Sequence, residues 1–181
     1  MSLFQSALED VANGVYFGWA VVEGPPNAPL NTGRNRPVKA VVNVGYSPTF
    51  EGKENKEKIA EAHLITKSSL GGRNESPEDD KGALIEGDYD DNDEDVEIEG
   101  DFYGETMRLQ LIGYLRPEQK FGSFPELIAQ IRADIGNARR ALGLMPFVFS
   151  KEDKFVRDCG ASNWMGAGGG DGLASWEFES W

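Results

Sequence analysis

The sequence predicts a mainly β fold, a small β-barrel of antiparallel strands closed by one helix. Short runs rich in β-branched and aromatic residues recur through the first two thirds of the chain, as in strands. A single segment with apolar residues at helical spacing follows them. The length of 181 residues and the hydrophobic share of 39% fit one domain with additional segments that contribute little to a core.

Four segments have the pattern of strands. Residues 14–22, GVYFGWAVV, are rich in aromatic and β-branched side chains, and residues 38–44, VKAVVNV, form a continuous apolar run typical of burial on both faces. Residues 59–66, IAEAHLIT, and 107–114, MRLQLIGY, alternate from one side of a strand to the other. These four segments are the expected walls of the barrel.

One helix is expected to begin at Ser123 and to cover the strands. Ser123 is a suitable N-cap, and Glu126 three residues later completes the pattern of a capping box. Gly143 is a natural C-terminal stop. The apolar side chains form one stripe at helical spacing: Leu127, Ile128, Ile131, Ile135, Ala138 and Leu142. Residues 2–12 are expected to form a loop or a single helical turn.

Two segments differ from the rest in composition. Within a domain of residues 1–155, residues 67–100 are acidic and rich in Gly, Asp and Asn, which predicts a surface insertion in a hairpin. Residues 156–181 form a glycine-rich, aromatic C-terminal tail. Its large aromatic side chains are expected either to pack on the domain or to bind a protein partner: Trp164, Trp176, Phe178 and Trp181.

The negative charge is concentrated in one segment. Between Glu75 and Asp101 there are 14 acidic residues and a single base, Lys81, whereas 17 acids and 17 bases balance elsewhere. No basic face is left to neutralise phosphates, so nucleic acid is not expected as a partner. The acidic loop 75–101 is instead a candidate surface for a protein partner.

The sequence also bears on location. No apolar run is long enough for a transmembrane helix, and residues 1–12 lack the basic start and apolar core of a signal peptide. The lone cysteine, Cys159, allows no internal disulfide. The expected location is the cytoplasm or an organelle, including a plastid if a transit peptide is removed, and the protein is not expected to be secreted.

An ordered set of motifs resembles the riboflavin kinase (flavokinase) family. GVYFGWA is similar to the second barrel strand of that family, NVGYSPTF to its Asn-x-Gly-x-x-Pro-Thr-Phe turn, and AEAHLI to its Glu-x-His strand. DFYGE, YLRPEQKF and LGLMPFVFSKEDKF follow in the family's order, so the resemblance covers residues 12–155 apart from the insertion. It implies a Greek-key barrel that uses Mg-ATP to phosphorylate the 5′-hydroxyl of riboflavin, giving FMN.

The resemblance implies a catalytic role for Glu61. This residue matches the family's general base, which accepts the proton of the ribityl hydroxyl during phosphoryl transfer. Strand alternation places it on the same face as His63, which is expected to be a hydrogen-bonded structural residue beside it. The alternative is an ordinary surface glutamate. Asn43 and Thr49 are expected on the nucleotide side.

The flavin side is expected in the loop before the helix. Arg116, Glu118 and Phe121 match the family's loop that closes over the isoalloxazine ring. The alternative is that Arg116 and Glu118 only pair with each other at the entrance to the helix.

The family's Pro-Thr-Ala-Asn motif does not occur in this chain. In the family its Thr and Asn bind the nucleotide-associated Mg²⁺, so no metal ligand is identifiable here. Two interpretations remain open. The chain is an N-terminally shortened riboflavin kinase, or it is a catalytically inactive subunit of a larger complex, with the acidic loop and aromatic tail as contacts.

Overall fold

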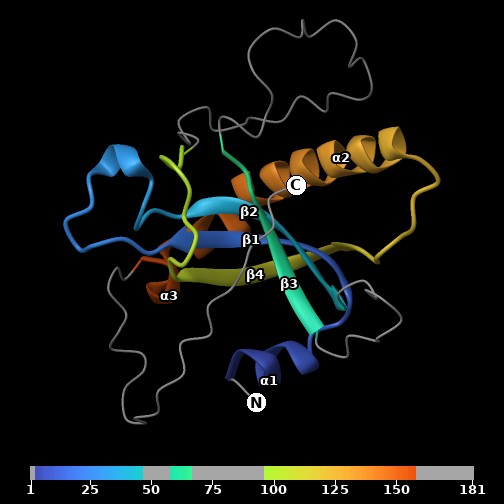
Figure 1. The fold of residues 1–181 in the computed structure, drawn as a ribbon, viewed down its shortest axis with the longest axis horizontal. Helices are drawn as coiled ribbons and strands as arrows, with labels where there is room; N and C mark the ends of the chain where they lie inside the picture. Colours follow the sequence, from blue (N-terminus) through green and yellow to red (C-terminus); the bar gives the residue numbers. More distant parts are fainter. Residues whose placement is uncertain (1–2, 47–57, 67–95, 158–181) are drawn as a thin grey trace, which may run out of the picture.

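The computed structural model describes residues 3–46, 58–66 and 96–157 (Figure 1). Thr49, most of the acidic loop and the four tail aromatics lie outside the described residues. No helix in the described part of the chain is long and apolar enough to cross a membrane. The helices and strands are, in order, α1 (Leu3–Glu9), β1 (Gly14–Val22), η1 (Leu30–Thr32), β2 (Val38–Tyr46), β3 (Lys58–Leu64), β4 (Met107–Arg116), α2 (Phe124–Gly143), η3 (Phe147–Glu152) and α3 (Lys154–Arg157).

The four strands form one antiparallel sheet in the order β3-β2-β1-β4. Strands β1 to β3 are sequential neighbours, and β4 returns after a long connection to lie beside β1, which is Greek-key order. The predicted mainly β fold with one long C-terminal helix is therefore confirmed. Within the described residues, β3 and β4 are the edges of the sheet.

The strand ends are decided by pairing. Strand β1 has the predicted bounds, but β2 continues to Tyr46 because Gly45 and Tyr46 pair with Ile59 and Lys58 of β3. Strand β4 likewise continues to Arg116, which pairs with Val15. Both extensions lengthen the strands at the end of the sheet where the predicted site residues lie.

Each face of the sheet has its own apolar core. On one face, Phe17, Trp19 and Val21 of β1 pack with the apolar stripe of α2, including Ala138 and Leu142. On the other face, Leu8 of α1 packs against the small side chains Ala20, Ala40, Val42 and Val44. The long helix therefore covers one face only, as Figure 1 shows for α2 and α1 on different sides of the strands.

Helix α2 begins as predicted, with one difference at its cap. The Ser123 hydroxyl accepts the Glu126 N–H at 3.4 Å, but the Glu126 carboxylate accepts the Gly122 N–H at 3.0 Å. The capping box is thus closed one residue earlier than the Ser123 N–H that the pattern predicts. At the other end, Gly143 is the last helical residue, and the extended residue Leu144 caps the helix through its N–H to Ala141 O.

Arg34, in the loop between β1 and β2, binds residues 99–105, the segment in which the acidic loop ends. Its guanidinium donates to both carboxylate oxygens of Glu105, at 2.9 and 2.7 Å, and to the carbonyls of Glu99 and Asp101. The hydrogen bond to Glu105 is the main cause that raises the pKa of Arg34 above its ordinary value. Residues 96–106 are thereby held against the loop between β1 and β2.

Candidate functional site

A row of aligned residues crosses the sheet and connects the two predicted halves of the site. Glu61 of β3 lies opposite Asn43 of β2, Asn43 lies opposite Val15 of β1, and Val15 lies opposite Arg116 of β4. Directly opposed residues of antiparallel strands project to the same face. Because Phe17, two residues after Val15, packs with α2, this is the helix-covered face.

Glu61 is positioned by its cross-strand neighbour. The Asn43 side-chain amide donates to one carboxylate oxygen of Glu61, Nδ2 to Oε2, at 3.4 Å. Glu61 is only partly buried, so its carboxylate combines one orienting contact with access from outside. A general base needs both properties. Of the two residues expected on the nucleotide side, the structure brings Asn43 to Glu61, while Thr49 lies outside the described residues.

His63 lies on the same face as Glu61, opposite Val41, as the alternation predicts. Its Nε2 atom is buried and has no hydrogen-bond partner within the described residues, which differs from the expected hydrogen-bonded role at this atom. Burial lowers the pKa of His63 below its ordinary value of 6.5, because the charged imidazolium loses hydration. The imidazole is therefore neutral at pH 7.

The lowered pKa of His63 predicts a pH dependence of stability. Below pH 6.5 the unfolded chain binds a proton at His63 more readily than the folded chain, so the free energy of unfolding falls as pH falls. His63→Gln is expected to remove this part of the loss. Urea unfolding of both proteins at pH 8 and pH 5 measures it. Equal pH dependence in the two proteins would contradict the prediction.

Arg116 pairs with helix α2. Its Nε lies 3.0 and 3.1 Å from the two carboxylate oxygens of Asp134, and its Nη2 lies 2.7 Å from Oδ2. Its Nη1 donates to Pro117 O, and the guanidinium carbon lies 5.9 Å from the centre of the Phe121 ring. Arg116 therefore has Asp134 of the helix as its ion-pair partner, whereas the alternative expected Glu118.

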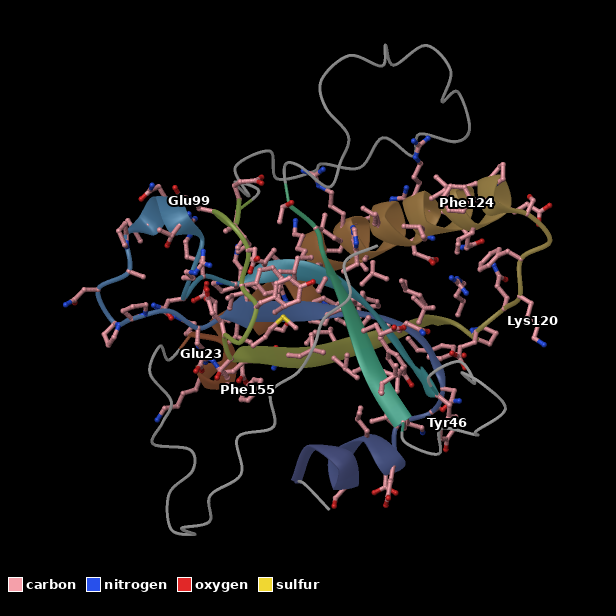
Figure 2. All side chains as sticks on the ribbon, viewed as in Figure 1. Glu23, Tyr46, Glu99, Lys120, Phe124 and Phe155 are labelled. Carbon is pink, nitrogen blue, oxygen red and sulfur yellow. The ribbon has the colours of Figure 1, made fainter. Side chains whose placement is uncertain are left out.

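Glu118 points to the end of β2 instead. The Asn13 side chain donates to its Oε2 at 3.4 Å, and its carboxylate rests directly on Gly45. A methyl group on Gly45 would lie 2.2 Å from Glu118 Oε1, so the close approach depends on the glycine. Gly45 is two residues beyond Asn43, so Glu118 attaches the loop after β4 to the strand that supports Glu61. In Figure 2 this loop, labelled at Lys120, runs past the end of the sheet where Tyr46 is labelled.

Three site residues were not predicted from the sequence: Asn13, Gln130 and Asp134. Asp134 is 3% exposed, and Gln130 donates to its Oδ1 at 2.9 Å. The sequence contained a signal that could have identified Asp134. This residue lies beside Ile131, Ile135 and Ala138 of the apolar stripe, and a carboxylate buried at such a position requires a cationic partner. Nothing local to Asn13 indicates its contact with a residue more than a hundred positions away.

The arrangement combines a carboxylate on β3 with an arginine at the end of β4 and an aromatic ring on the loop that follows. Among the described residues, no group of three or more His, Cys, Asp or Glu side chains converges as a metal site. The carboxylate, the arginine and the aromatic ring are the groups that the structure places at the helix-covered face of the sheet and on the adjoining loop.

Comparison with known proteins finds similarity to one family, the riboflavin kinases. The profile of the family described as Flavokinase: Riboflavin kinase matches residues 2–76 and 91–142. Riboflavin kinase of Mus musculus is 30% identical over 148 residues, which cover 82% of this chain and 68% of the mouse protein. Riboflavin kinase of Homo sapiens is 29% identical with the same coverage. The bifunctional riboflavin kinase/FMN phosphatase of Arabidopsis thaliana is 29% identical over 153 residues, 84% of this chain and 29% of that protein.

Proposed function

Because the chain belongs to the riboflavin kinase family, we propose that it transfers the γ-phosphate of ATP to the 5′-hydroxyl of riboflavin, giving FMN. The supporting observation is the row of aligned residues across the sheet. At one end of this row Asn43 contacts Glu61, and at the other end Arg116 is the last residue of β4 before the loop. The reaction requires a base and a flavin-binding loop on one face, together with a bound nucleotide.

Glu61 acts as the general base. The 5′-oxygen of riboflavin forms a bond to the γ-phosphorus while its proton passes to the Glu61 carboxylate, and the bond between the γ-phosphorus and the bridging oxygen of ADP breaks. Asn43 holds one carboxylate oxygen, so the other is directed to the substrate hydroxyl. The fixed carboxylate lowers the cost of orientation at the moment of transfer.

The loop after β4 binds the flavin. Phe121 and the guanidinium of Arg116, 5.9 Å apart, offer a flat aromatic and cationic surface to the isoalloxazine ring. Glu118 contacts Asn13, just before β1, and lies beside Gly45 of β2. Thr49 is assigned, with Asn43, to the nucleotide side. Mg²⁺ bound with ATP would neutralise charge on the phosphates in this reaction.

The direct test is FMN production. The purified chain is incubated with riboflavin, ATP and Mg²⁺, and FMN is separated from riboflavin by chromatography with fluorescence detection. FMN is expected to accumulate with time only when ATP is present. Absence of both FMN formation and riboflavin binding would reject the proposed function.

A second candidate function is supported by the segments that the family profile leaves out, residues 77–90 and 143–181. They include the middle of the acidic loop 75–101 and the tail 156–181 with its tryptophans, which are candidate contacts in a catalytically inactive subunit. Riboflavin binding without FMN formation, together with stable association with a larger complex that is lost on removal of residues 158–181, is the result expected of this alternative. Robust turnover by the chain would reject it.

Gly45→Ala is expected to shift the Glu118 carboxylate, because the added methyl group overlaps Oε1 at the flexible end of this exposed side chain. We expect the KM for riboflavin to rise about threefold, the size of effect that loss of one contact of an exposed charged side chain gives. The matched control is Gly136→Ala in α2, where nothing lies within 4 Å of the added methyl group. An unchanged KM for Gly45→Ala in steady-state kinetics would show that the contact does not control the loop.

A further inference from the structure

We propose that Asp134 is a positioning residue that sets the affinity for riboflavin by holding Arg116. The proposal rests on the proposed function, since it assigns Arg116 to the flavin side. Asp134 itself lies on helix α2, outside the loop that would touch the substrate, so it acts through the arginine.

The contact between the two residues is extensive. Asp134 receives three hydrogen-bond contacts from Nε and Nη2 of Arg116, all between 2.7 and 3.1 Å, and a fourth from Gln130 at 2.9 Å. Such a fork between a guanidinium and a carboxylate restricts the plane of the arginine as well as its position. The remaining Nη1 donates to Pro117 O at the start of the loop. All three nitrogen atoms of the guanidinium are thus oriented by the protein before any ligand is bound.

Burial restricts the movement of the Asp134 side chain, and Asp134 in turn restrains Arg116 at the start of the loop after β4. The side chain is 5% exposed, and neighbouring Ile135 and Ala138 are buried in the core between α2 and the sheet. A buried carboxylate that lost Arg116 would lack its neutralising charge, so the paired arrangement is strongly preferred. Because the Arg116 guanidinium carbon lies 5.9 Å from the centre of the Phe121 ring, the contact with the helix places one flavin-side group and brings it near the other.

This arrangement predicts an effect on one ligand only. An ion pair with a purely structural role would alter unfolding without favouring either substrate. A positioning role instead weakens riboflavin binding while ATP binding, which is assigned to Asn43 and Thr49, is unaffected. The two roles are therefore separated by comparing riboflavin with ATP in the same variant.

The experiment uses Asp134→Asn in the full chain, with Asp10→Asn as the matched control at an exposed position. Riboflavin affinity is measured without ATP by quenching of flavin fluorescence, and the KM values for riboflavin and ATP, kcat and Tm are measured in parallel. We expect the Kd and KM for riboflavin to rise about tenfold, the loss given by one charge-assisted hydrogen bond. The KM for ATP and kcat are expected to change less than about twofold, and Asp10→Asn to leave all values unchanged.

Two further variants show whether Asp134 acts through Arg116. In an Arg116→Ala background, Asp134→Asn is expected to cause no additional loss of riboflavin affinity, since the group it positions is absent. Gln130→Ala, which keeps the ion pair and removes one donor to Asp134, is expected to weaken riboflavin binding by about threefold and serves if Asp134→Asn does not fold.

The results distinguish this inference from the proposed function. Normal riboflavin affinity in folded Asp134→Asn, or in Gln130→Ala if that variant replaces it, overturns the positioning role even if the wild-type chain forms FMN. Weakened binding in the variant supports the positioning role even if the wild-type chain binds riboflavin and forms no FMN. Additive losses in the double variant, equal losses for riboflavin and ATP, or absence of riboflavin binding by the wild-type chain also overturn it.

Discussion

Replacing Glu61 with glutamine is expected to lower kcat for FMN formation by about 10²- to 10⁴-fold, the contribution typical of a positioned general base. Glutamine keeps the size of the side chain and the contact with Asn43 Nδ2, which donates to Glu61 Oε2 at 3.4 Å. It cannot accept the proton of the substrate hydroxyl. The KM for riboflavin is expected to change little, since the flavin side lies on the loop after β4.

The control for this variant is Glu9→Gln, an exposed glutamate at the end of α1, which is expected to have normal kinetics. Steady-state rates of both variants are compared with the wild-type chain, and circular dichroism checks the fold. A wild-type rate for Glu61→Gln would show that another group accepts the proton. Asn43→Ala is a useful companion, since loss of the orienting amide is expected to lower kcat less than loss of the base itself.

The second large effect is expected on stability, from Leu142→Ala. Leu142 is 0% exposed in the core between α2 and the sheet, with Phe17, Trp19 and Ala138 in the same cluster. Truncation of such a side chain removes apolar burial and leaves a cavity, which lowers the free energy of unfolding by about 2–5 kcal/mol. The loss is measured by urea unfolding with the m-value compared between proteins.

The same substitution two residues away provides a matched control. Leu144 is 51% exposed beyond the end of α2, so Leu144→Ala is expected to change the free energy of unfolding by less than about 0.5 kcal/mol. Similar losses at the two positions would contradict the observed packing of the helix. Since α2 also carries Asp134, riboflavin affinity of Leu142→Ala under folded conditions reports how far the site depends on the placement of the helix.

Much of the fold could be predicted because its signals are local. The aromatic and β-branched run of residues 14–22 defined β1 to the residue, and the Ser123 cap with its apolar stripe located α2. Alternation alone placed Glu61 and His63 on one face. Strand ends at Tyr46 and Arg116 were missed because they depend on the partner strand, and sequence alternation contains no information on which residue lies opposite.

For the candidate site, the sequence by itself determined which chemical groups are present: a carboxylate at Glu61 beside His63, an arginine at the end of β4, and an aromatic ring on the loop that follows. Only the tertiary structure decided their partners. Arg116 binds Asp134 and not Glu118 because α2 folds back over the sheet, and Glu118 reaches Gly45 because β2 and β4 both flank β1. These contacts join residues far apart in the chain, so they follow from strand order and helix packing, which local patterns do not specify.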